Sequence, residues 1–312
     1  MSKLLVIFGA TGQQGGSVLD FVLNDTELSS KYTIRAITRD ANSDTAKQIS
    51  SKGVEVVSAD PNNESTLRPA LKGASIVFAM TFPSFADVSN TESIEVRQGR
   101  AITDAAVAEK VEYLVYSTLP YVSKLSGGKY TKVQGFDGKA IVEEYIRQQP
   151  IKSAFFAPGS FMQNYNSMMK PRPVGDGTYS ISRHCRADTQ LPLIDAAGDS
   201  GKWVGAILAD PAKYEGKSFC AATKLYTLDE QAEILSRATG KKVVYKQLPE
   251  DVYRSMLPPV YGDMLMEMMS YQQDFGYYGV DQAEKIAWAA EHARGKLITF
   301  EEFLEKNPVQ LA

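Results

Sequence analysis

Cysteine and histidine are scarce in this chain of 312 residues, which contains two of each. The cysteines, Cys185 and Cys220, form no C-x-x-C pair, and His184 and His292 stand at no spacing typical of metal ligands. Zinc sites commonly use histidine ligands, and a Ser-His-Asp triad uses a histidine as its general base. We therefore predict no metal site, and hydrolase functions are not favoured.

Long apolar runs and an excess of either charge are also missing. The first apolar run, Leu4–Phe8, ends at Gly9 and is too short for a signal peptide or a membrane span. Together with the low cysteine count, this predicts a location in the reducing cytoplasm and no membrane association. The chain has 34 basic and 37 acidic residues and a formal net charge of -3, so we expect no direct binding to nucleic acid.

Short apolar runs alternate with helical patterns over the first half of the chain, which is typical of a parallel sheet covered by helices. The predicted strands are Leu4–Phe8, Tyr32–Thr38, Val54–Ser58, Ser75–Met80, Tyr113–Ser117 and Ala154–Ala157. The predicted helices are Gly15–Leu23, Ala41–Ser51, Glu64–Leu71, Glu92–Glu109 and Gly138–Gln148. The predicted fold class is α/β, with a doubly wound parallel sheet of the Rossmann type over residues 1–158.

The pattern changes after Pro158, where prolines and glycines interrupt the chain. Residues 159–312 predict a smaller lobe of mixed α/β structure, and part of 194–224 is expected to complete the first domain. Two helices in this half should begin at capping boxes, in which a hydroxyl residue precedes a glutamate by three positions. The pairs are Thr227 with Glu230 and Thr299 with Glu302.

The most informative segment lies between the first predicted strand and the first predicted helix. It reads Gly9-Ala10-Thr11-Gly12-Gln13-Gln14-Gly15-Gly16, a G-x-x-G-x-x-G pattern. Glycines at such a β-α turn let the backbone turn sharply and approach a pyrophosphate, while the helix N-terminus attracts the phosphates. Gly12 is the expected point of closest approach. We predict that residues 9–15 bind a dinucleotide, the alternative being a β-α turn without a ligand.

The end of the second predicted strand indicates which dinucleotide. A site for NAD places a carboxylate there to bind the adenosine ribose, whereas this chain has Thr38-Arg39. Arginine suits a 2′-phosphate, so NADP(H) is predicted in preference to NAD(H). The alternative is a solvated arginine at a strand end. Asp60, after the third strand, is predicted beside the adenine ring, with a turn-forming Asp-Pro as its alternative.

The proton-transfer pair of ordinary short-chain dehydrogenases is absent. Those enzymes use a tyrosine with a lysine four residues later, and none of the 16 tyrosines here has that lysine. On the helix after the fifth strand, Lys139 stands in the lysine position and Gly135 in the tyrosine position. Ser117 and Thr118 offer hydroxyls, but a hydroxyl alone is a poor proton donor at neutral pH. Ordinary carbonyl reduction is therefore disfavoured.

The chain contains, in this order, the glycine turn, Thr38-Arg39, Tyr116-Ser117, Phe136-x-x-Lys139, Val142-Glu143-Glu144-Tyr145, Pro158-Gly159-x-Phe161-x-x-Asn164 and Leu191-Pro192-Leu193-Ile194-Asp195. Together these motifs resemble the NmrA-like family of atypical short-chain dehydrogenases, and the resemblance covers essentially the whole chain. The resemblance implies a Rossmann domain with a smaller lobe and a dinucleotide bound across the cleft between them. It also leads us to expect cofactor contacts from Thr81, Ser117, Lys139, Pro158, Phe161 and Asn164.

The leading hypothesis is an NADP(H)-dependent redox sensor that acts as a transcriptional co-regulator through protein partners. An intact cofactor turn beside an incomplete proton relay motivates it. The resemblance implies a partner such as a GATA-type transcription factor, and with it a nuclear as well as a cytoplasmic location. A ligand can report in this way only if it binds two conformations with different affinity. The protein is expected to be a monomer or a homodimer.

The alternative hypothesis is an NADPH-dependent reductase of a small carbonyl, quinone, imine or enone substrate. Isoflavone-reductase-like relatives are similar in using a lysine on this helix, which makes Lys139 the candidate acid or base and Ser117 a second catalytic candidate. A purely structural role for Lys139, fixing ribose hydroxyls, fits both hypotheses. The expected apolar wall of the substrate pocket is Phe161, Met162, Tyr165, Met168 and Met169.

Three weaker features have plainer alternatives. The methionines of residues 264–269 predict either an adaptable contact face or core filling, with core filling the commoner case. Arg183, His184 and Arg186 predict either an anion contact or a solvated edge. Cys185, between basic neighbours, is a candidate redox thiol if it is exposed.

Overall fold

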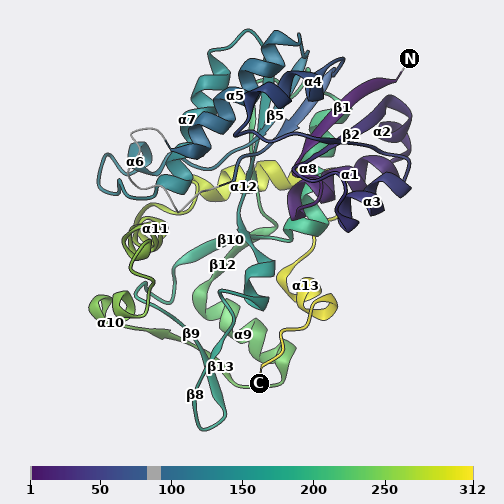
Figure 1. Cartoon of the computed structure of the whole chain (residues 1–312). Coiled ribbons are helices and arrows are strands. Elements are labelled where there is room, and N and C mark those ends of the chain that lie inside the picture. Colours follow the sequence, from purple (N-terminus) through teal and green to yellow (C-terminus); the bar gives the residue numbers. More distant parts are fainter. Residues whose placement is uncertain (1, 83–92, 312) are drawn as a thin grey trace.

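The apolar runs of the first half form one sheet whose two faces are both covered by helices (Figure 1). The computed structural model describes residues 2–82 and 93–311. Within these residues the sheet has seven strands, all parallel to their neighbours, in the order β11-β6-β5-β4-β1-β2-β3. The strands are β1 (Lys3–Phe8), β2 (Tyr32–Thr38), β3 (Glu55–Ser58), β4 (Ile76–Ala79), β5 (Tyr113–Ser117), β6 (Lys152–Pro158) and β11 (Ser218–Ala221).

Alternate residues of each strand contribute to two separate apolar cores. In β1, Leu5 and Ile7 belong to one core, and Val6 and Phe8 belong to the other. This is the arrangement of a doubly wound sheet, in which both faces are buried. The first core is covered by α1 (Gln13–Asn24), α2 (Thr26–Lys31), α3 (Asp44–Ser51), α8 (Ala196–Ala209) and α12 (Gln282–Glu291). The second core is covered by α4 (Leu67–Leu71), α5 (Ile94–Ala108) and α7 (Gln134–Arg147).

The predicted fold class and all six predicted strands are confirmed, with differences at the helix ends. Helix α3 begins at Asp44, later than the predicted Ala41, because the side chain of Ser43 caps it by accepting from the Ala46 N–H. Helix α7 begins at Gln134, before the predicted Gly138. The predicted start of the helix after β4, Glu92, lies outside the described residues. Helix α2 was not predicted, although Asp25 caps it.

The second half adds two small sheets and further helices below the parallel sheet (Figure 1). The strands are β7 (Ser160–Phe161), β10 (Gln190–Ile194) and β12 (Lys224–Thr227) in one sheet, and β8 (Arg172–Gly175), β9 (Thr178–Arg183) and β13 (Val243–Gln247) in the other. The helices are α9 (Leu228–Thr239), α10 (Glu250–Ser255), α11 (Gly262–Phe275) and α13 (Phe300–Lys306), and a short helix, α6 (Val122–Leu125), precedes α7. Both predicted capping boxes are present, at the starts of α9 and α13.

The chain does not divide simply at one point along its length. Strand β11 pairs with β6 at one edge of the parallel sheet, and α12 packs against β11, so late segments complete the first unit. The division at residue 158 therefore remains a prediction about independent units. In the part of the chain that the structure describes, no helix combines the length and apolar character needed to cross a membrane.

Candidate functional site

The predicted cofactor residues follow different strands but meet at one edge of the sheet, because parallel strands end on the same side. Gly9 follows β1, Arg39 follows β2, Asp60 follows β3 and Thr81 follows β4, while Ser117 ends β5. Strand β1 lies between β2 and β4, so the chain changes direction across the sheet at this position. Open α/β sheets bind ligands at such a switch point, beyond the carboxyl ends of the strands.

The glycine turn leaves the start of α1 open. Gly9 has a φ of +66°, a conformation that suits glycine, and its carbonyl accepts from the Gly12 N–H at 2.9 Å. Among the described residues no side chain caps α1 and its first turn holds no acidic residue. Gly12 is exposed, so its backbone is accessible at the start of the helix. These features fit a phosphate group.

Gly15 has a packing role at the start of α1. A Cβ at this position would overlap the carbonyl of Gly9 and lie 2.7 Å from the carbonyl oxygen of Phe8. Both are main-chain atoms, which cannot move aside as a flexible side chain can. The glycine therefore allows α1 to sit directly on the end of β1.

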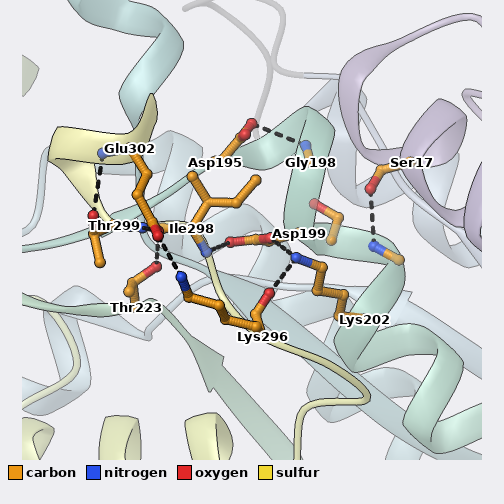
Figure 2. A network of polar contacts seen from close by, with 12 residues as sticks. Ser17, Asp195, Gly198, Asp199, Lys202, Thr223, Lys296, Ile298, Thr299 and Glu302 are labelled. Atoms are coloured by element: carbon orange, nitrogen blue, oxygen red, sulfur yellow. Dashed lines mark hydrogen bonds and ion pairs between the residues drawn. The ribbon is translucent and has the colours of Figure 1, made fainter. Parts of the chain in front are cut away.

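Helix α1 is also held from the other side by α8, through the contacts in Figure 2. The Gly201 N–H donates to the Ser17 hydroxyl at 3.0 Å. On α8, the buried carboxylate of Asp199 accepts from Lys202 at 2.6 Å and from the Ile298 N–H at 2.8 Å. The segment before α13 is thereby joined to the helix that supports the glycine turn.

Arg39 lies exposed at the end of β2 with its guanidinium 5.9 Å from the centre of the Phe82 ring. Within the described part of the chain it forms no ion pair. The neighbouring carboxylate of Asp40 is engaged in its own turn, where it accepts from the Asn42 N–H at 2.8 Å. Arg39 thus offers a cation beside an aromatic ring, at a position where an anion could reach it.

Asp60 forms the turn that the sequence left as its alternative. Its carboxylate accepts from the Asn62 N–H at 2.9 Å and from the Asn62 side-chain amide at 3.0 Å. Its own N–H donates to the hydroxyl of Thr66. This carboxylate shapes the loop after β3, and any contact with an adenine ring would be additional to that role.

Lys139 belongs to a buried polar network at the end of β4. Its ammonium lies 2.6 Å from a carboxylate oxygen of Glu95, 2.9 Å from the carbonyl oxygen of Thr81 and 3.1 Å from the hydroxyl of Thr81. The Thr81 hydroxyl donates to Glu95 at 2.8 Å, so the Tyr116 hydroxyl, 3.0 Å away, is the donor in its contact with Thr81. Burial raises the pKa of Tyr116 far above its ordinary value.

The remaining candidate hydroxyls are also engaged within the protein. Ser117 is buried and donates to the side-chain oxygen of Gln14, on the first turn of α1, at 2.7 Å. Thr118 is buried and donates toward the carbonyls of Leu119 and Lys139 at 3.4 and 3.5 Å. Gln14 therefore links the glycine turn to the end of β5.

Pro158, Phe161 and Asn164 follow one another at the end of β6, where Pro158 is buried and the other two are half-buried. The segment is fixed by Gln163, whose amide donates to the carboxylate of Asp195 at 2.6 Å. Asp195 is the N-cap residue of α8, and it accepts from a backbone N–H of that helix as well. Phe161 and Asn164 are thus tied to the helix that packs on α1.

The expected apolar pocket wall is largely wrong. Met162 and Tyr165 are fully buried in the core of the second half, and the Tyr165 hydroxyl is bonded to Gln231. Met168 points to solvent, with 80% of its surface exposed. Met162 and Tyr165 are three positions apart in the 3-10 turn Met162–Asn166, so both lie on its buried side, while Met168 comes after the turn.

Two of the three weaker candidates resolve toward their plainer alternatives, and the basic cluster fits neither of its interpretations. Cys185 is buried, and burial raises its pKa to about 11, so it is not an exposed thiolate. Arg183 and His184 are buried as well, which excludes both a surface anion cluster and a solvated edge at these two positions. In α11, Met269 is buried and Met268 packs between two apolar cores. Core filling therefore accounts for these two methionines.

Glu95 is the functional candidate that the sequence analysis missed. It lies in the first turn of α5, with only 4% of its side chain exposed, and it carries the carboxylate of the network around Lys139. A charged residue on the buried face of an amphipathic helix is the signal that could have found it. Its partner on α7 could not be read from the sequence, because the two helices are brought together only by packing.

Fold and site together define a Rossmann-type α/β protein, with the glycine turn at the switch point of the parallel sheet. The model of the NmrA-like family matches residues 1–304, and the chain belongs to this family. An NmrA-like family domain-containing protein of Dictyostelium discoideum is 26% identical over 98% of both chains. The NmrA-like oxidoreductase cpsB of Aspergillus campestris is 30% identical over 82% of this chain and 79% of its own.

Solved structures show the same fold. The negative transcriptional regulator NmrA in complex with NADP superposes with a TM-score of 0.79 at 22% identity, over 99% of this chain and 98% of its own. An NADPH-dependent quinone oxidoreductase of Escherichia coli, in complex with NADPH, gives a TM-score of 0.76 at 22% identity, over 97% of this chain and 99% of its own. At these identities the likeness concerns the fold.

Proposed function

We propose that this chain binds NADP(H) along the carboxyl edge of the parallel sheet. The uncapped start of α1 and the bare backbone at Gly12 support binding of the pyrophosphate there. The guanidinium of Arg39, which has no ion-pair partner among the described residues, supports a 2′-phosphate, and hence NADP in preference to NAD. Lys139 and Thr81, at the end of β4, are proposed to face the nicotinamide ribose.

The function that the site supports best is that of an NADPH-dependent reductase whose substrates need no proton from the protein. The observation that carries this proposal is that every candidate donor is already bonded internally: the hydroxyls of Thr81, Tyr116 and Ser117 and the ammonium of Lys139. Bound NADPH would supply a hydride. A ketone also requires a proton on its oxygen as the alkoxide forms, and no described group here is free to give one.

Three kinds of substrate accept a hydride without that proton. A quinone becomes a hydroquinone anion, which takes its proton from water, while an iminium ion or a triarylmethane cation becomes neutral directly. The names of relatives agree with such chemistry: the 30% identical Aspergillus campestris protein is called an oxidoreductase. Proteins of the same fold are called a quinone oxidoreductase and a triphenylmethane reductase.

A redox sensor and transcriptional co-regulator is the second candidate. The internal bonding of every donor also favours a protein that binds its cofactor without turnover. In that case the NADP(H)-bound chain, as a monomer or homodimer, would act through a protein partner such as a transcription factor, in the cytoplasm and nucleus. The cofactor would have to bind two conformations of the chain with different affinity.

The test combines calorimetric titration with NADPH, NADP, NADH and NAD and an assay of NADPH absorbance. The acceptors are a naphthoquinone, a cyclic iminium ion and a triarylmethane cation, each paired with a ketone of matching skeleton. We expect tighter binding of the NADP pair than of the NAD pair, and NADPH oxidation by at least one of the three acceptors but by none of the ketones.

Other outcomes separate the alternatives. Tight NADPH binding without oxidation by any acceptor would favour the sensor. Faster oxidation by a ketone than by its matched acceptor would overturn the claim that the protein gives no proton. Absence of binding to all four dinucleotides would overturn both candidate functions.

A further inference from the structure

Glu95, in the first turn of α5, makes its polar contacts with residues outside its own helix. Its side chain is 4% exposed and lies against the 12% exposed side chain of Lys139, with 2.6 Å between carboxylate oxygen and ammonium nitrogen. A buried ion pair is costly to desolvate and is weak evidence for a role in stability. Here it lies at the carboxyl end of β4, directly beside the proposed cofactor contacts.

We propose that Glu95 is a positioning residue that fixes the Lys139 ammonium where the nicotinamide ribose of NADPH would bind. This inference rests on the proposed function. Glu95 itself is almost completely buried and touches Lys139 and Thr81, so it acts through these two side chains.

The hydrogen bonds of the ammonium show why a carboxylate is needed. An ammonium group has three N–H donors, and here its three acceptors come from only two residues, Thr81 and Glu95. Both Thr81 acceptors are neutral, so among the described residues Glu95 alone supplies a compensating negative charge at this distance. Removing that charge would leave a buried cation with neutral acceptors only.

The packing of α5 against α7 creates this arrangement. A Cβ at Gly99 would lie 2.5 Å from Cγ1 of Val142, and a Cβ at Gly138 would lie 3.5 Å from Oε2 of Glu95. Both glycines allow the two helices to approach closely. Glu95 is also in the first turn of α5, where the helix dipole favours a negative charge.

The network also indicates which hydrogen bond can be exchanged. The Thr81 hydroxyl donates to Glu95 and accepts from both Lys139 and Tyr116, so its hydrogen-bonding capacity is already filled. Its bond to Lys139, at 3.1 Å, is the longest of the three that the ammonium makes. A ribose hydroxyl would take over this N–H, while the bond to Glu95 keeps the ammonium in place.

The experiment compares NADPH affinity, by calorimetry at about pH 7 and about pH 9, in the wild type, Glu95→Gln and Glu109→Gln. Glu109 caps the other end of α5, and its ion pair with Arg68 makes it a matched control. We expect Glu95→Gln to bind NADPH about tenfold more weakly than the wild type at pH 7. Its affinity should fall by about another tenfold at pH 9, because no carboxylate then stabilises the charged form of the Lys139 side chain. The wild type and Glu109→Gln should change less than about twofold.

A purely structural role would not make the affinity depend on pH. Wild-type affinity of Glu95→Gln at both pH values would overturn the positioning role while leaving NADPH binding intact. Absence of binding by the wild type would overturn the proposed function and this inference with it.

If Glu95→Gln does not fold, the double variant Glu95→Gln/Lys139→Met tests whether the uncompensated charge of Lys139 is the cause. This variant removes both charges of the buried ion pair. Recovery of folding in the double variant would support the inference. Failure of the double variant to fold would overturn it.

Discussion

At the scale of the residue, Gly15 and Gly135 show that two helical glycines can have opposite effects. We predict that Gly15→Ala lowers the free energy of unfolding by about 2 kcal/mol, because its Cβ would collide with main-chain atoms of residues 8 and 9. Beyond the backbone of its own helix, no described atom lies within 4 Å of the place that a Cβ would take at Gly135, on α7. Gly135→Ala should therefore raise stability by up to about 1 kcal/mol. Urea unfolding of both variants checks this, and equal effects would contradict it.

Arg39 is the residue on which cofactor preference is predicted to depend. Arg39→Asp sets a carboxylate against a 2′-phosphate, so we expect NADPH affinity to fall at least tenfold while NADH affinity changes less than about threefold. Because the guanidinium is exposed, the protein should keep its stability. Titration of the variant with both dinucleotides measures the ratio. If the affinities for NADPH and NADH fell by the same factor, Arg39 would not be the residue that determines cofactor preference.

At the scale of the element, α11 has two faces with different tasks. Met266, Met268 and Met269 pack against the apolar cores, while acidic residues of the helix bind the loop that leads into α7. Glu267 accepts from the N–H groups of Thr131 and Lys132 at 2.8 and 2.7 Å. Asp274 pairs with Lys129 at 2.6 Å and accepts from the Tyr130 hydroxyl at 2.7 Å. The helix thus anchors the start of the element that carries the site lysine.

The contacts of Asp274 with Lys129 and Tyr130 predict that the free energy of unfolding decreases at acid pH. The bond from Lys129, with that from Tyr130, lowers the pKa of Asp274 from its ordinary value to about 2. A depressed pKa contributes stability above the unfolded value, and that contribution is lost as the pH falls from about 4 toward 2. Because Asp274 is partly exposed, we expect Asp274→Asn to reduce the loss of unfolding free energy between about pH 5 and pH 3 by about 0.5 to 1 kcal/mol.

Thermal unfolding at the two pH values measures this difference. Asp251→Asn, which removes an exposed carboxylate of α10, serves as the control and should retain the wild-type change. If Asp274→Asn lost as much stability as the wild type between the two pH values, the ionised carboxylate of Asp274 would make no electrostatic contribution to folding.

At the scale of the whole molecule, the parts that the sequence predicted are those with local signals. Continuous apolar runs marked the six strands of the first half, and the glycine spacing marked the turn after β1. Capping boxes located the starts of α9 and α13. Strand β11 was not predicted as a strand, because it has only four residues and its partner in the sheet, β6, lies far away in the sequence.

The candidate site shows the same limit. Lys139 was found by its position in a motif, but its surroundings depend on Thr81 and Glu95, from two other elements. Met162 and Tyr165 were misplaced because the 3-10 turn packs both of them into the core of the second half, against segments that are distant in the chain. What the sequence could not give is therefore the set of contacts between segments that are distant in the chain.

The late arrival of β11 and α12 also has a consequence for synthesis on the ribosome. Domains generally begin to fold from the N-terminus as the chain emerges, but here β6 emerges well before its neighbour β11, and the helix that covers β11 emerges later still. Until then the nascent sheet has an unpaired edge, which is a template for association with other chains. Slow translation between β6 and β11 would prolong that exposure, so the order of segments along the chain sets how long the nascent sheet is open to pairing with other chains.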